Sequence, residues 1–181
     1  NSACKAEVHL GIAGDVKNAL FMVIGTGVGG TIISNGQIQP GEHAYGGEFG
    51  MMLVDGRREL SELGSAVHVA RKYSKLKRKE YTGEEVFALA EAGEVDAVTA
   101  TEELYHYLAL GIYNMQYTID PEYIVLGGFI TKKADLLDHL YRKLAEIMNY
   151  GQRCPIMPKI RIAKFGNDAN LIGAALTAEG K

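Results

Sequence analysis

The chain has 181 residues, of which 47% are apolar and 23% charged, the composition of an ordinary globular domain rather than a disordered or collagen-like chain. The net charge is −3, from 19 basic and 22 acidic residues, so bulk electrostatics give no reason to expect a nucleic-acid partner. The longest apolar run, residues 19–24, is far short of the roughly 20 residues that span a bilayer. Cys4 and Cys154 lack metal-type spacing and suit a reduced compartment. We therefore expect a cytoplasmic protein that binds neither membrane nor nucleic acid.

The first part of the chain is expected to contain one helix, three short strands and a loop. Gly11 follows the helical segment, and glycine is favoured where a helix ends. The Asn35-Gly36 pair is the strongest short signal for a hairpin between strands. The expected bounds are 1–10 for the helix, 20–24, 31–34 and 37–39 for the strands, and 40–50 for the loop.

The remainder of the chain is expected to alternate between helices and strands. Asp120-Pro121 ends the longest helix, because a residue that precedes proline leaves the α region. The pattern indicates one α/β domain over residues 1–181. Helices are expected at 60–79, 83–92, 95–117, 134–149 and 169–178, and strands at 123–128 and 159–165.

Four glycines occur within the six residues Gly25–Gly30. They fit the G-x-G-x-x-G pattern of dinucleotide sites, but that fingerprint needs a helix directly afterwards, and here a β-branched strand and the Asn35-Gly36 turn follow. Between two antiparallel strands, such a loop lets backbone N–H groups approach a phosphate with no Cβ in the way. Thr26 adds a hydroxyl at the tip. A plain hairpin is the alternative, although it requires fewer glycines.

A second glycine pair, Gly127-Gly128, follows a strand at its carboxyl end. Ligands bind at this end of the strands in open α/β sheets. A simple strand-to-helix turn explains the pair equally well, so the two interpretations stay open at this point.

Four motifs in this order and spacing resemble the ROK family of repressors, open reading frames and sugar kinases. They are GTGVGG (25–30), GGEFG (46–50), DPEYIVLGG (120–128) and FGNDANLIGAAL (165–176). The resemblance covers essentially the whole chain and corresponds to the C-terminal half of such proteins. It implies an α/β, ribonuclease H-like (actin-like ATPase) domain, with a mixed β-sheet flanked by helices. ATP would lie in the cleft between this domain and an N-terminal domain absent from the chain.

The resemblance also implies binding roles for particular residues. The residues it assigns to ATP phosphates are Gly25, Thr26, Gly27 and Gly29; those assigned to adenosine are Gly127 and Gly128. Glu48 would accept hydrogen bonds from sugar hydroxyls, a role that suits a carboxylate because charge-assisted bonds are the strong ones. His43 is a second candidate for the substrate site because it lies in the loop that leads to Glu48.

No catalytic residue is assigned within the chain. NSACKAE (1–7) matches the end of the family's E-N-D-A-N-x-A-x-x-A-E stretch, so the resemblance places the general-base aspartate two residues before Asn1. Asp168 lies in a similar Gly-Asn-Asp-Ala-Asn stretch, but it precedes the last expected helix, where Asn and Asp favour the N-cap. We therefore expect the chain by itself to be inactive.

Two departures from the family pattern concern zinc and sugar. Met51 stands where most members have a zinc-binding histidine, and residues 54–65 contain none of the family's cysteines, so no zinc is expected. A sugar-contacting acid of the family aligns with Ser61, and Glu62 is one residue away.

The resemblance then favours a hexose or glycoside kinase that uses ATP and Mg²⁺ and forms a homodimer. The alternatives are the sugar-sensing domain of a transcriptional repressor and a non-catalytic paralogue.

Opposite charges gather in adjacent segments of the middle of the chain. Residues 71–80 hold six cations and one acid, whereas residues 81–103 hold seven acids and neither Lys nor Arg. Such blocks form solvated helix faces or pair with each other more often than they bind nucleic acid, and we expect this here.

Overall fold

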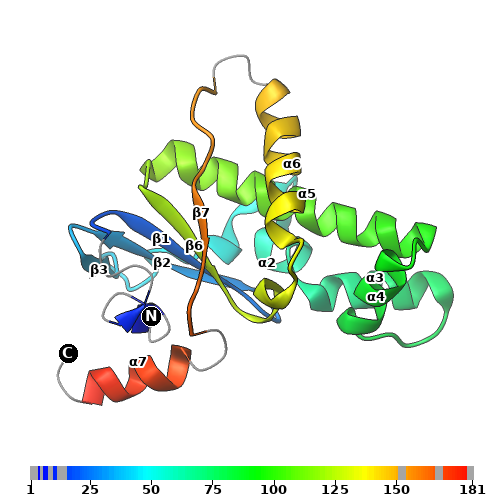
Figure 1. Cartoon of the computed structure of the whole chain (residues 1–181), viewed down its shortest axis with the longest axis horizontal. Helices are drawn as coiled ribbons and strands as arrows, with labels where there is room; N and C mark the ends of the chain where they lie inside the picture. Colours follow the sequence, from blue (N-terminus) through cyan, green and yellow to red (C-terminus); the bar gives the residue numbers. More distant parts are fainter. Residues whose placement is uncertain are drawn as a thin grey trace.

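The computed structural model describes residues 4, 6–7, 10–11, 16–150, 154–165 and 169–178. A five-stranded mixed sheet, in the order β3-β2-β1-β6-β7, lies between helices (Figure 1). Its strands are β1 (Ala19–Ile24), β2 (Val28–Ser34), β3 (Gln37–Gln39), β6 (Tyr123–Gly127) and β7 (Ile160–Ile162). A separate hairpin consists of β4 (Leu53–Asp55) and β5 (Arg58–Glu59). The predicted fold class, a mixed sheet flanked by helices, is confirmed.

Most of the helices follow the first three strands. Their bounds are α2 (Leu60–Leu63), α3 (Ala66–Lys77), α4 (Gly83–Glu91), α5 (Val95–Ile119), α6 (Leu136–Tyr150) and α7 (Ala169–Ala178), with short 3₁₀ helices η1 (Phe49–Met51) and η2 (Phe129–Lys132). Within the described part of the chain, no helix is both long and apolar enough to cross a lipid bilayer.

Alternation along the central strands divides the core into two clusters. Leu20, Met22 and Ile24 face a large cluster that includes the buried leucines of α5 and α6. Phe21 and Val125 face a smaller cluster on the other side, where N-terminal residues and α7 lie in Figure 1. Period-two alternation is what a strand requires to bury side chains on both faces of a sheet. Because the central strands are covered on both sides, their ends are the places left for a ligand.

Two local predictions are confirmed. Cys4, Ala6, Glu7 and Leu10, which are the described residues of the helix expected at 1–10, are helical, and the Gly11 N–H donates to Glu7 O at 3.1 Å. The Asn35-Gly36 turn joins β2 to β3 with both φ angles positive, at 52° and 74°, the conformation that two-residue hairpins prefer.

The expected helix over residues 60–79 is wrong as a single element. It is divided into α2 and α3 because Ser65 adopts an extended conformation (φ −119°, ψ 147°) and caps α3 through its side chain, which accepts from the His68 N–H. A serine hydroxyl competes well for the free N–H groups of a new helix. The strand expected at 31–34 also begins earlier, at Val28, so Gly29 lies within β2 opposite Val23 rather than in a loop.

The loop expected at 40–50 ends in the η1 helix. The β4–β5 hairpin follows it, in a segment for which the sequence predicted no element. Asp55 forms an ion pair with Arg58 within the hairpin and accepts a hydrogen bond from the Tyr107 hydroxyl at 2.9 Å. Hydrogen bonds from Arg58 and then Tyr107 lower the pKa of Asp55. These contacts tie the hairpin to α5, and no local sequence pattern marks them.

The charged segments of the middle region pair across helices, as expected. Lys72 contacts Glu103, and Lys77 contacts both Glu94 and Asp96. Asp168, by contrast, lies outside the described residues, so its expected capping role stays a prediction.

Candidate functional site

Both glycine motifs lie at the same end of the sheet. Strands β1 and β6 are parallel neighbours with Val23 opposite Gly127, so the turn after β1 lies beside Gly128. Gly128 has φ 93°, and a Cβ there would lie 2.3 Å from Ile24 O. Only glycine permits both the positive φ and this close approach. The carboxyl ends of adjacent parallel strands thus bring together two segments that are about 100 residues apart in the sequence.

The first glycine motif forms a tight turn between antiparallel β1 and β2. The turn comprises Gly25, Thr26 and Gly27, and it is closed by a hydrogen bond from Gly25 N to Gly27 O at 2.9 Å. Thr26 is exposed at the tip. A Cβ on Gly25 or on Gly29 would meet no atom within 4 Å. Packing therefore gives no reason for glycine at these two positions, whereas the approach of a ligand to the backbone would.

A hollow of about 290 Å³ adjoins this turn. Its walls come from the end of β1 and its turn, the start of α3, and η2: Ile24, Gly25, Thr26, Ala66, Val67, Phe129 and Ile130. A neighbouring hollow of about 220 Å³ shares Ala66, Phe129 and Ile130 and continues toward α4. Mostly apolar walls with a few backbone polar groups at one end are typical of small-molecule sites.

The loop that carries Glu48 packs directly on β2. A Cβ on Gly50 would lie 1.8 Å from Val28 O, and one on Gly47, whose φ is 89°, would lie 2.6 Å from Thr31 Cα. Gly30 is required as well, because a Cβ there would lie 2.4 Å from Phe49 Cδ2. These glycines serve packing, and they place the exposed Glu48 side chain beside the glycine turn's outgoing strand.

The predicted site residues therefore form two neighbouring groups. The turn of Gly25–Gly27 and the Gly127-Gly128 pair share the hollow's end of the sheet, while Glu48 lies on the segment packed against β2. His43 is exposed in the same loop as Glu48, and within the described part of the chain no hydrogen bond or ion pair joins the two.

Sequence reasoning missed part of the hollow and one contact. Ala66 and Val67 reach the hollow only because α3 begins there, and Phe129 directly follows the Gly127-Gly128 pair. The position of Phe129 next to the glycine pair could have indicated that it lines the site. No sequence motif marks Ala66 or Val67 as lining residues. The contact that sequence reasoning missed is a hydrogen bond from the Val28 backbone N–H to the Ser61 hydroxyl.

Metal-binding groups are not gathered in the described ranges. No group of three or more His, Cys, Asp or Glu there is arranged to hold a metal ion.

Comparison with known proteins establishes the family. The model of the ROK family matches residues 1–181, and its solved members share this actin-like ATPase fold. The chain belongs to the ROK family, which confirms the resemblance read from the motifs.

Particular relatives are sugar kinases. A beta-glucoside kinase of Listeria innocua is 35% identical over 184 residues, covering 96% of this chain and 60% of the relative. A glucokinase of Halalkalibacterium halodurans is 32% identical over 197 residues, covering 96% and 59%. A solved ROK family protein from Streptococcus pneumoniae, in complex with sucrose, has a TM-score of 0.89 at 30% identity, covering 99% of this chain and 64% of that one. The chain thus spans about 60% of the length of these curated relatives.

Proposed function

We propose that this chain forms the C-terminal part of an ATP-dependent sugar kinase that transfers the γ-phosphoryl group of ATP to a hydroxyl of a hexose or hexose glycoside. The observation that carries the proposal is the Gly25–Gly27 turn, which lies at the carboxyl end of the central strands with open space beside Gly25 and Gly29. The similarity to beta-glucoside kinase and glucokinase supports the reaction class.

Each group of residues has its own role in this proposal. Backbone N–H groups of the turn bind phosphate oxygens, and the Thr26 hydroxyl donates at the tip. The apolar hollow between Val67 and Phe129 receives the adenosine, next to Gly127 and Gly128. Glu48 accepts hydrogen bonds from two sugar hydroxyls and thereby orients the attacking one, and His43 contributes to the same sugar site. Phosphoryl transfer depends mainly on such positioning.

The proton of the attacking hydroxyl needs a base that the described residues do not supply. By the family motif that ends in residues 1–7, we place an aspartate just upstream of Asn1 in this role. An N-terminal domain would complete the ATP cleft, and Mg²⁺ would accompany the phosphates. General-base assistance contributes typically 10²–10⁴-fold to rate, so the isolated chain should not phosphorylate sugars.

The test is an ADP-release assay of the intact protein across hexoses and β-glucosides. Replacing Glu48 with Gln should lower kcat/KM for the sugar about 10- to 100-fold, the equivalent of losing hydrogen bonds to a charged group. Glu42→Gln is the matched control, because Glu42 is also an exposed acid of the same loop and its replacement should leave the kinetics unchanged.

The ATP side is tested by Gly25→Ala. The added methyl group meets no protein atom, so the melting temperature should hold while kcat/KM for ATP falls about tenfold or more because the methyl group obstructs the phosphate. If the intact protein binds sugar but releases no ADP with any sugar, the kinase proposal fails and a sugar-sensing role takes its place.

A further inference from the structure

The outer edge of β2 lacks a neighbouring strand where the chain leaves the glycine turn. Strand β3 pairs only with Ile32–Ser34, so Val28 has no strand partner on that side. The Ser61 side chain takes the place of one. Its Oγ accepts from Val28 N at 2.9 Å and donates to Val28 O at 2.9 Å. One hydroxyl thus satisfies both backbone groups of the first residue after the turn.

The same hydroxyl lies against the two loops of the candidate site. A Cβ on Gly27 would lie 3.2 Å from Ser61 Oγ, and a Cβ on Gly50 would lie 2.2 Å from it. Gly27 ends the turn proposed to bind phosphate, and Gly50 belongs to the segment that carries Glu48. Ser61 therefore lies against both halves of the site, and at position 50 only glycine allows so close an approach.

The residue that precedes Ser61 is buried and closely packed. The preceding residue, Leu60, is fully buried, and its N–H donates to Met52 O at 2.9 Å. A Cβ on Gly111 of α5 would lie 2.6 Å from Leu60 Cδ2, so α2 is seated directly on the long helix α5. A hydroxyl on such a closely packed base can hold the glycine turn in one position.

We propose that Ser61 is a positioning residue that clamps Val28 and thereby holds the phosphate-binding turn in register with the Glu48 loop. This inference rests on the proposed function. Ser61 aligns with an acid that contacts sugar in the family pattern, but here its hydroxyl proton is donated to Val28 O and one of its lone pairs accepts from Val28 N. Its effect on catalysis passes through Val28 and Gly27 to the nucleotide.

The test is Ser61→Ala in the intact protein, with Ser74→Ala as the matched control. Ser74 makes the same kind of contact, because its Oγ accepts from Tyr81 N at 2.8 Å and donates to Tyr81 O at 3.4 Å. It lies seven residues along α3 from Val67, about 10 Å along the helix axis. Both variants should lose similar stability, but only Ser61→Ala should raise the KM for ATP, by about tenfold, with the KM for sugar changed less than about twofold.

A second readout does not depend on activity. Amide hydrogen exchange at residues 27–29 should accelerate in Ser61→Ala and stay unchanged in Ser74→Ala. An unaltered KM for ATP together with unaltered exchange at residues 27–29 overturns the role of Ser61, and so does an equal rise of KM in both variants. Faster exchange in a protein that phosphorylates no sugar would instead support the clamp and refute the proposed kinase function.

Discussion

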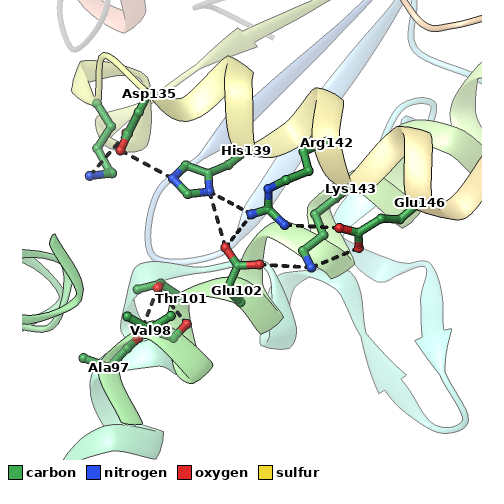
Figure 2. A network of polar contacts seen from close by, with 10 residues as sticks. Ala97, Val98, Thr101, Glu102, Asp135, His139, Arg142, Lys143 and Glu146 are labelled. Carbon is green, nitrogen blue, oxygen red and sulfur yellow. Dashed lines mark hydrogen bonds and ion pairs between the residues drawn. The ribbon is translucent and has the colours of Figure 1, made fainter. Parts of the chain in front are cut away.

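The α5–α6 interface and the carboxyl end of the central strands differ in how closely side chains fill the space between elements. Between the helices, the Glu102 carboxylate forms ion pairs with Arg142 at 2.5 Å and with Lys143 at 3.0 Å, and the His139 ring lies 3.4 Å from it (Figure 2). At the sheet end, the backbone of Gly25 and Gly29 borders open space. The network between the helices is closed by the protein's own side chains, whereas the space beside Gly25 and Gly29 holds no side chain.

The largest expected effect distinguishes glycines that packing requires from glycines that are proposed to bind the nucleotide. Gly50→Ala should lower the free energy of unfolding by about 3 kcal/mol, because its methyl group would lie 1.8 Å from Val28 O and overpacking of this kind costs about 1–3 kcal/mol. Urea denaturation of the intact protein measures the loss. The comparison variant is Gly25→Ala, whose unfolding free energy should stay near that of the wild type. Equal losses in the two variants would contradict the distinction.

A smaller effect is expected in the helical network. Replacing Glu102 with Gln should destabilise the protein by about 1 kcal/mol at neutral pH, the usual upper range for partly exposed ion pairs. Denaturation at low and high salt measures it, and the difference should shrink with salt. Glu80→Gln is the control, because Glu80 is exposed and forms no ion pair with the described residues.

The stability difference between the wild type and Glu102→Gln should depend on pH, because the pKa of Glu102 is shifted in the folded protein. Burial works to raise it, but the hydrogen bonds from Arg142 and Lys143 prevail and lower it. A carboxylate with a lowered folded-state pKa contributes stability above its ordinary pKa of about 4.3 and loses it as the pH falls through the folded value. The wild type and Glu102→Gln should therefore converge in acid. A constant difference down to acidic pH would show that the charge of Glu102 is not what stabilises the interface.

The smallest expected effect is a difference in chemical reactivity between the two cysteine thiols, with no change in stability. Burial raises the pKa of Cys4 to about 12, so this thiol should stay protonated and resist alkylation by iodoacetamide at about pH 8. Cys154 is only half-buried beside the Tyr113 hydroxyl, with Sγ at 2.7 Å from it. Peptide mapping should find Cys154 modified first and Cys4 only after denaturation; simultaneous modification would argue against the tight packing of Cys4.

Local sequence patterns predicted much of this protein because their causes are local. The Asn35-Gly36 turn is set by the two residues' tolerance of positive φ, and the central strands by alternation of apolar side chains on both faces. The glycine density at Gly25–Gly30 likewise marked the turn between β1 and β2. These features need no knowledge of distant residues, and the family motifs added the proposed roles of Glu48 and Gly128.

Other features exist only because distant segments meet. The break between α2 and α3 depends on Ser65 capping one helix while Leu60 of the other is buried against α5. The hollow needs Val67 and Phe129, which lie 62 residues apart, to face the same turn. In the sequence, Ser61 marks only the loss of an acid from the family pattern, and its two hydrogen bonds to the Val28 backbone are visible only in the tertiary structure. Tertiary structure decides such contacts because they depend on where the chain returns in space, which no short pattern encodes.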